Sequence, residues 1–316
     1  MADMTGQTDT LRRYILFKEG LGETSKFSEY HPTVNLIYFV FVIGITMFAT
    51  SPVFLAVTFF CAWFYSVILR GYKAIKMNIV FMLPIFAVMV FVNTFFNHNG
   101  ETILFYLNKA PITKEALVFG VAAAIVLTSV IIWFMCFNVI MSADKFIFLF
   151  GRAAPILGLL LSMTFRFIKL LKVRFREISE GQKCLGKEEN KKILSRIRQL
   201  LKEVSILISW SLEASIETAD SMEARGYGLK GRTFFHIYKF TGRDLKMMIL
   251  ILISGGISAL GCIMKEMTMY YYPVLDFPEE SWLTAVVLTF YGILLLLPAI
   301  SDIYGELKWE RLNSEM

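Results

Sequence analysis

The sequence predicts an all-α polytopic membrane protein with about six transmembrane helices and a polar domain of long helices between the fourth and fifth. The 316 residues are 56% hydrophobic and only 18% charged, whereas soluble domains carry about a quarter charged residues. The apolar residues gather in runs close to the ~20 residues that a membrane-spanning helix needs. One long polar stretch, residues 165–244, interrupts the series. Lipid is therefore the expected solvent for most of the chain.

Six apolar runs are long enough to cross a bilayer. Ser51-Pro52 separates the first two, and this dipeptide favours a sharp reversal. Pro84 lies inside the third, where neighbouring groups in a membrane bundle can satisfy the freed carbonyl. The predicted spans are Val34–Thr50, Val53–Leu69, Asn78–Phe96, Ala116–Met141, Leu245–Met264 and Ser281–Ile300.

A further apolar stretch, Phe146–Phe165, is predicted to lie at the membrane interface or to insert only partly. Arg152 and Pro155 interrupt it, and an arginine inside the bilayer is costly unless it snorkels or pairs. A full crossing of this stretch stays open as an alternative, and it would place the next segment on the opposite side.

The distribution of Lys and Arg predicts that both termini and the central segment are cytoplasmic, since connections rich in these residues mark that side. The connection 70–76 carries three of them, and basic residues outnumber acidic ones in 166–202. The alternate loops, 97–115 and 265–280, are poorer in Lys and Arg. The expected organisation is a cytoplasmic N-terminal segment (1–33), spans one to four (34–141), interfacial and cytoplasmic helices (142–244), spans five and six (245–300) and a cytoplasmic C-terminal tail (301–316).

The central segment is predicted to form two long helices of opposite charge. Arg166, Lys169 and Arg176 recur at helical spacing on the first, and the acidic residues of 213–223 form a stripe on the second. Gly226 is expected to end the second helix, because glycine readily adopts the left-handed conformation found there. Two arrangements remain open: both charged faces are solvated, or the helices cross and the opposite charges face each other.

Groups for catalysis or metal binding are sparse. The cysteines show no CxxC spacing and are expected to be buried packing residues, and the histidines lie far apart. A metal site and a cofactor are therefore not expected. No phosphate-binding loop of the Walker type occurs, so ATP hydrolysis is expected to be done by another chain. The residues concerned are Cys61, Cys136, Cys184 and Cys262, with His31, His98 and His236.

One arginine stands out at the end of the acidic helix. The string Ser221-Met-Glu-Ala-Arg-Gly-Tyr-Gly228 places Arg225 between Ala224 and Gly226. The helix dipole favours any cation there, so lysine would serve equally well for capping alone. The small neighbours let another surface approach, and a guanidinium offers five donors in a rigid fork that suits carboxylates and carbonyls.

Together with His31-Pro32, Ser51-Pro52 and Phe165-Arg-Phe-Ile168, this string resembles the transmembrane T component of energy-coupling factor transporters, over roughly residues 31–304. The resemblance implies a non-catalytic scaffold in an ATP-driven importer of vitamins or transition-metal ions. In that family, cytoplasmic coupling helices transmit movement of two ATP-binding-cassette ATPase subunits to a small membrane substrate-binding (S) subunit. The implied location is the plasma membrane of a bacterium or archaeon.

Each coupling helix in the family ends in a short Ala-Arg-Gly-like motif that docks on one ATPase. The second motif corresponds to Ala224-Arg225-Gly226 and the first to Cys184-Leu185-Gly186, in which leucine replaces the family's arginine. The resemblance therefore implies two chemically different ATPase contacts, one through a guanidinium and one through an apolar side chain.

Two other classes of function remain as alternatives. A stand-alone secondary transporter would need ionisable residues inside its spans, where this chain has uncharged polar residues such as Asn78 and Asn138. A polytopic membrane enzyme would need His, Asp or Glu clustered at one membrane face. Nucleic acid is not expected as a partner, because a basic stretch after a membrane span more often meets a membrane surface or a protein. The sequence does not identify the solute.

Overall fold

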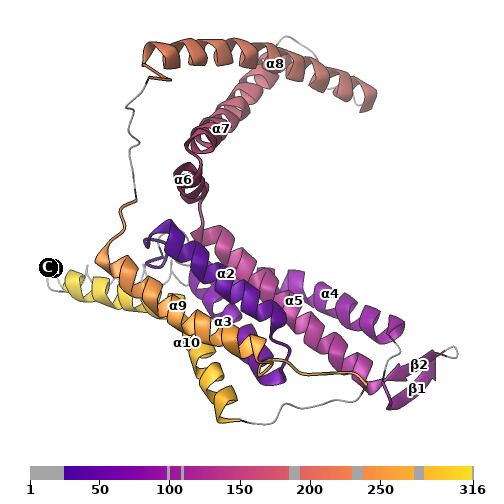
Figure 1. The fold of residues 1–316 in the computed structure, drawn as a ribbon. Helices are drawn as coiled ribbons and strands as arrows, with labels where there is room; N and C mark the ends of the chain where they lie inside the picture. The colour runs from indigo at the N-terminus through magenta and orange to yellow at the C-terminus, as the bar shows by residue number, and fades with distance from the viewer. Residues whose placement is uncertain are drawn as a thin grey trace. The chain divides into compact units, whose positions relative to one another are not determined.

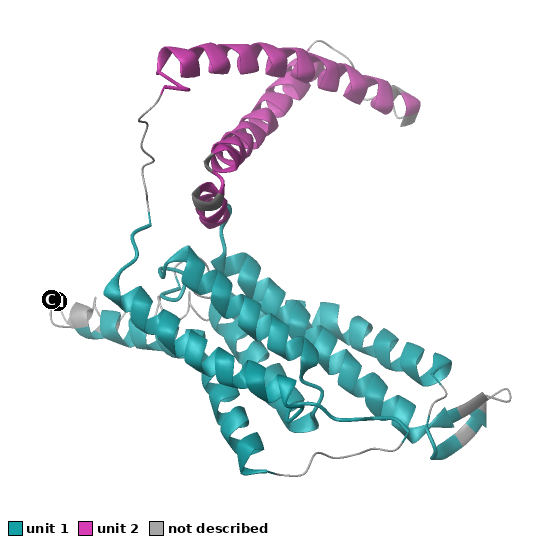
Figure 2. Cartoon of the chain, viewed as in Figure 1, with its two compact units in different colours: residues 1–143, 238–316 teal, residues 144–237 magenta. Residues whose placement is uncertain are grey.

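The computed structural model describes residues 25–97, 100–107, 110–184, 193–229, 238–273 and 281–314. The chain divides into two compact units, which Figure 2 colours separately: unit 1 is 1–143 with 238–316, and unit 2 is 144–237. Unit 2 falls within the range 142–244 that the sequence assigns to interfacial and cytoplasmic helices. Its location on the cytoplasmic side stays a prediction.

Unit 1 is a bundle of apolar helices (Figure 1). In the described part of the chain, five helices have the length and hydropathy to cross a membrane. A sixth apolar helix, α2, has 17 residues, the lower end of the range of ~17–25 for spanning helices. The prediction of an all-α polytopic membrane protein is therefore confirmed. The bundle helices are α2 (Pro32–Phe48), α3 (Pro52–Arg70), α4 (Tyr72–Phe96), α5 (Lys114–Ile140), α9 (Gly242–Ile263) and α10 (Trp282–Ser314).

Prolines and glycines set the boundaries of the first helices. Pro32 and Pro52 begin α2 and α3, where the missing N–H is not needed for an intrahelical hydrogen bond. Gly71, with φ 60°, separates α3 from α4. Pro84 lies inside α4, as the sequence predicts for a membrane helix.

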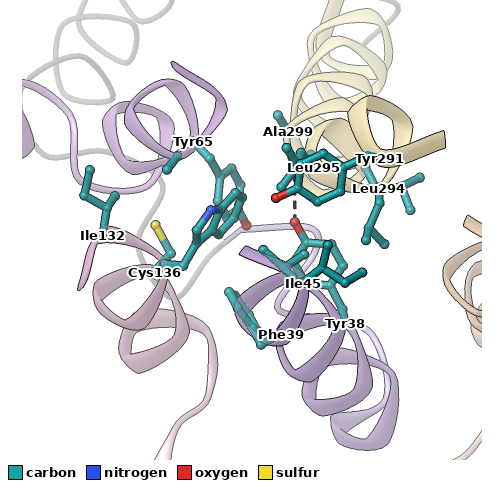
Figure 3. Packing of buried hydrophobic residues seen from close by; sticks show 14 of the residues in the cluster. Tyr38, Phe39, Ile45, Tyr65, Ile132, Cys136, Tyr291, Leu294, Leu295 and Ala299 are labelled. Atoms are coloured by element: carbon teal, nitrogen blue, oxygen red, sulfur yellow. Dashed lines mark hydrogen bonds between the residues drawn. The ribbon is translucent and has the colours of Figure 1, made fainter. Parts of the chain in front are cut away.

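An aromatic cluster joins α2, α3 and α5 at the centre of unit 1. The rings of Tyr38, Phe39 and Tyr65 lie 6.3, 6.5 and 6.0 Å from the ring of Trp133. All four side chains are almost fully buried, and Figure 3 shows Tyr38 and Phe39 of α2 on one side of the core and Tyr65 of α3 on another. Because lipid tails are as apolar as these rings, close packing rather than exclusion from water holds such helices together.

Hydroxyl groups tie α10 to the same core. The hydroxyl of Tyr291 lies 3.1 Å from Thr46 Oγ1 on α2 and 2.7 Å from Thr58 Oγ1 on α3. The hydroxyl of Tyr38 donates to the carbonyl of Leu295 at 3.5 Å, the dashed line in Figure 3. A buried hydroxyl in a membrane bundle is costly without such a partner, so these contacts favour one arrangement of the three helices.

Small residues on α9 allow close helix contacts on two sides. A Cβ added at Gly255 would lie 2.8 Å from the ring of Phe41 on α2, and one at Gly261 would lie 2.5 Å from Val287 on α10. Glycine at these positions therefore lets α9 approach both neighbours, as is common for membrane helices.

Two features of unit 1 go beyond the prediction. The loop 97–115 contains an antiparallel hairpin of β1 (Ile103–Leu107) and β2 (Ala110–Thr113). The aliphatic and aromatic side chains of β1 are typical of a strand. Helix α10 continues to Ser314, beyond the end of the predicted span Ser281–Ile300 and into the predicted tail 301–316. The prediction followed hydropathy, which ends at Ile300, whereas a helix backbone does not require apolar side chains.

Unit 2 contains α6 (Ala143–Ala153), α7 (Pro155–Cys184) and α8 (Ile193–Ala224). The stretch Phe146–Phe165 is not one helix, because α6 ends at Ala153 and α7 begins at Pro155. A residue before proline is disfavoured in the helical conformation, which accounts for the break at Ala154. The interfacial location of this stretch stays a prediction.

Candidate partner-docking site

The end of α8 is closed by a Schellman motif, with Arg225 at the C-cap, directly after the last helical residue, Ala224. The N–H of Tyr227 donates to the carbonyl of Met222 at 3.0 Å, and the N–H of Gly226 donates to the carbonyl of Glu223 at 2.9 Å. Gly226 adopts φ +79°, the left-handed conformation that this motif requires. The predicted glycine-terminated helix end is therefore confirmed.

Arg225 stands exposed at this end. Its neighbours Ala224 and Tyr227 are also exposed, as is Leu229 beyond them. Within the described residues, the guanidinium makes no hydrogen bond or ion pair, although its backbone N–H is satisfied by the carbonyls of Ser221 and Met222. The five guanidinium donors are thus left for groups outside the described chain.

The α7–α8 contact is built on an aromatic ring rather than on ion pairs. Trp210 of α8 stacks on Phe167 of α7, with centroids 6.2 Å apart and planes 13° apart. The guanidinium of Arg174 lies 5.2 Å from the centroid of the same ring, a geometry that allows a cation–π attraction. The sequence does not predict this contact, because a single tryptophan carries no helical periodicity.

The two central helices contact each other, as one of the two open arrangements predicts, but in the described residues their opposite charges form no ion pair. Arg174 pairs with Glu177 on its own helix, with nitrogen and oxygen 2.6 Å apart. Across the described parts of α7 and α8, no ion pair joins the basic residues of 166–176 to the acidic stripe, whose members Glu213 to Glu223 are exposed. The solvated alternative holds, since exposed charges gain little from pairing.

The first predicted motif is described only at its first residue. Cys184 is the last residue of α7 and is exposed, so the expectation that all four cysteines are buried packing residues is wrong for this one. Cys136 is buried and Cys61 and Cys262 are partly buried. Leu185 and Gly186 lie outside the described residues.

The start of α9 makes a tertiary contact that the sequence does not predict. Thr241 and Asp244 form a capping box, and Asp244 also accepts the N–H of His31 at 3.2 Å. The Thr-x-x-Asp spacing before an apolar run is a recognisable signal for a helix start, but nothing in it points to His31. Among the described residues, no group of three His, Cys, Asp or Glu side chains is placed to hold a metal ion.

Comparison with known proteins assigns the family. Residues 23–235 match the family model described as CbiQ, cobalt transport protein, and no curated protein matches the chain. The matched range covers more than half of the 316 residues. It includes α2 to α8 and the Ala224-Arg225-Gly226 motif. The chain is thus a multi-pass transport component, and it belongs to the CbiQ family of cobalt transport proteins.

Proposed function

We propose that this protein is the transmembrane coupling subunit of an ATP-driven importer of the energy-coupling factor type. It passes movement of two bound ATPase subunits to a small membrane subunit that holds the solute, a transition-metal ion or a vitamin. The observation that carries this proposal is Arg225, which is exposed and without a partner in the described chain, at the hydrogen-bonded end of a 32-residue helix.

The dimensions of α8 suit a lever. At 1.5 Å per residue, its 32 residues extend about 48 Å. The Schellman motif satisfies the last carbonyls, so the helix keeps its hydrogen bonds up to the docking end. A displacement applied at Arg225 is therefore carried along the helix rather than lost in a frayed terminus.

The two ATPase contacts are proposed to differ in chemistry. Arg225 would donate to carboxylates or carbonyls in a groove of one ATPase, with Ala224 and Gly226 leaving room for the groove wall. The other motif, Cys184-Leu185-Gly186, would present Leu185 to an apolar surface of the second ATPase. Both motifs would lie on the cytoplasmic side, where the ATPases and ATP are found.

Two buried aspartates of unit 1 favour this role over that of a secondary transporter. Asp244 accepts the N–H of His31, and Asp302 accepts the N–H of Phe27 at 2.8 Å. Both side chains are thus engaged in holding backbone, whereas a coupling path for ions needs ionisable groups that are free to change partners.

Replacement of Arg225 by glutamate tests the proposal. We expect the variant to insert normally but to lose co-purification of one ATPase and uptake of radiolabelled Co²⁺. A buried interface arginine is typically worth about 2 kcal/mol or more, which corresponds to about 30-fold weaker binding. The matched control is Arg198→Glu, the same charge change at an exposed position of α8. Full ATPase binding by Arg225→Ala, or equal losses in the two glutamate variants, would contradict the anchor role.

Leu185 provides the second arm of the test. Leu185→Asp should weaken the contact with the other ATPase, because a carboxylate would have to be desolvated against an apolar surface. Leu185→Arg restores the family's residue and should be tolerated. Quantifying each ATPase separately after purification distinguishes the two contacts, and loss of the same ATPase in the Arg225 and Leu185 variants would argue against two anchors.

A further inference from the structure

The turn Ser25–His31 is held to the bundle by two buried carboxylates from distant parts of the chain. Asp302 of α10 accepts the N–H of Phe27 at 2.8 Å, and Asp244 of α9 accepts the N–H of His31 at 3.2 Å. The two aspartates are 1% and 3% exposed. Since a buried carboxylate is costly without such donors, the turn and the two helices stabilise one another in a single arrangement.

The connection to α9 is the more extensive of the two. The guanidinium of Arg243 lies 4.7 Å from the ring centroid of Tyr30 and 4.0 Å from the carboxylate of Glu29. The rings of His31 and Phe240 meet edge to face, with centroids 5.3 Å apart. Three side chains at the start of α9, from Phe240, Arg243 and Asp244, therefore hold residues 29–31. We call this set of contacts, between 29–31 and 240–244, the joint.

The joint lies where the chain re-enters unit 1. Helix α8 ends at Ala224 and α9 begins at Gly242, so residues 225–241 connect the docking end of α8 directly to Asp244. Helix α10, which carries the other carboxylate, has no such direct connection to unit 2. The two aspartates thus make similar bonds to one turn but differ in their position along the chain.

We propose that the joint is where movement of the coupling helices enters the membrane bundle, with Asp244 and His31 as positioning residues. This inference rests on the proposed coupling function. A pull on residues 225–241 reaches Phe240 and Asp244 first, and the hydrogen bond to His31 transfers it to the start of α2. If that hydrogen bond is lost, α9 moves but the turn and α2 stay in place.

The simpler role for Asp244 is to cap α9, and a matched pair of variants separates the two roles. Asp244 Oδ2 accepts both the N–H and the hydroxyl of Thr241, at 2.8 and 2.6 Å, while Oδ1 accepts from His31. Thr241→Ala removes the hydroxyl of the cap and leaves the bond to His31. Asp244→Ala removes the hydrogen bonds of the cap and the hydrogen bond from His31. Phe240→Ala, which truncates a side chain that is 47% exposed and so threatens folding least, is the second test variant.

The experiment is hydrogen exchange, followed by peptide mass spectrometry, on the chain purified with its ATPases. The nucleotide-free complex is compared with the complex trapped with ATP and vanadate. In the wild type and in Thr241→Ala, we expect trapping to change exchange in both 25–31 and 240–246. In Asp244→Ala the change should persist in 240–246 but fall about tenfold in 25–31, the scale set by losing one hydrogen bond to a charged group. Phe240→Ala removes the ring contact with His31 and keeps that hydrogen bond, so the change in 25–31 should fall less.

Asp302→Ala is the control for a purely structural loss. It should raise exchange at Phe27 in both nucleotide states, yet leave the nucleotide-dependent change at His31. The inference is overturned if trapping leaves 25–31 unchanged in the wild type, or if Asp244→Ala keeps the full change there. A wild-type chain that retains no ATPase would instead refute the proposed function, so the two failures are distinguishable.

Discussion

At the residue scale, the conformation of one glycine determines how Arg225 is presented. Gly226 has φ +79°, and an L-residue with a Cβ is strained in this region. A Cβ there would also lie 3.0 Å from Leu229 Cδ1. Because the two hydrogen bonds of the Schellman motif depend on this residue, its conformation decides whether the chain turns away after Arg225 or the last helical turn frays.

Gly226→Ala is expected to destabilise the end of α8 by about 1 kcal/mol, the usual penalty for a Cβ in the left-handed region. Amide exchange in 221–229 should rise, and ATPase binding should weaken less than in Arg225→Glu. Gly181→Ala is the control, because Gly181 lies within helix α7 with open space around its Cβ position. That change should slow exchange in α7, since alanine is the better helix former. Equal effects of the two alanines would show that the left-handed turn is unimportant.

At the element scale, Trp210 holds α7 and α8 together. Both helices expose many apolar side chains, so the contact at Trp210 is a local one rather than a continuous core. The stacked Phe167 and the guanidinium of Arg174 cover the ring. An aromatic pair contributes about 0.5–1.5 kcal/mol beyond burial, and a cation–π contact about 0.5–1 kcal/mol at an exposed site.

Trp210→Ala should therefore loosen unit 2 by about 1–2 kcal/mol. Faster amide exchange around 163–178 and 206–214 would measure the loss. Trp210→Phe keeps a ring against Phe167 with a weaker cation–π contact, so an intermediate effect is expected. Indistinguishable exchange in the alanine and phenylalanine variants would mean that the ring does not hold the helices.

At the scale of the whole molecule, the chain separates a membrane bundle from a unit that the sequence places in the cytoplasm. Unit 1 contains the apolar helices, and unit 2 contains helices with exposed charged residues, including Arg225. The Lys and Arg asymmetry between alternate connections predicts the orientation. Both termini and residues 169–244 are then cytoplasmic, and the loops 97–115 and 265–280 face outward.

Single-cysteine labelling with a membrane-impermeant reagent tests this orientation. In sealed cells, cysteines introduced at Asn99 or Pro278 should react and one at Glu189 should not, because the bilayer shields the cytoplasmic side. A chain that keeps the native Cys184, exposed at the end of α7, as its single cysteine is the control and should react only after the cells are permeabilised. Labelling at Glu189 in sealed cells would overturn the topology.

The sequence by itself determined the features that depend on neighbouring residues. The apolar runs predict the helices of the bundle because each span needs only its own ~20 residues. Gly226 predicts the end of α8 because a helix C-terminus is closed within about five residues. The candidate anchor, Arg225, could therefore be recognised before any fold was known.

Only the tertiary structure decided which distant residues meet. The bonds from His31 to Asp244 and from Phe27 to Asp302 join residues 213 and 275 positions apart. Charge patterning suggested ion pairs between α7 and α8, whereas the contact is made by Trp210, Phe167 and Arg174. The physical reason is that helical periodicity specifies which side chains share a face, but not which face meets which. That choice depends on the packing of all helices at once, where a few rings, glycines and buried carboxylates favour one arrangement over the others.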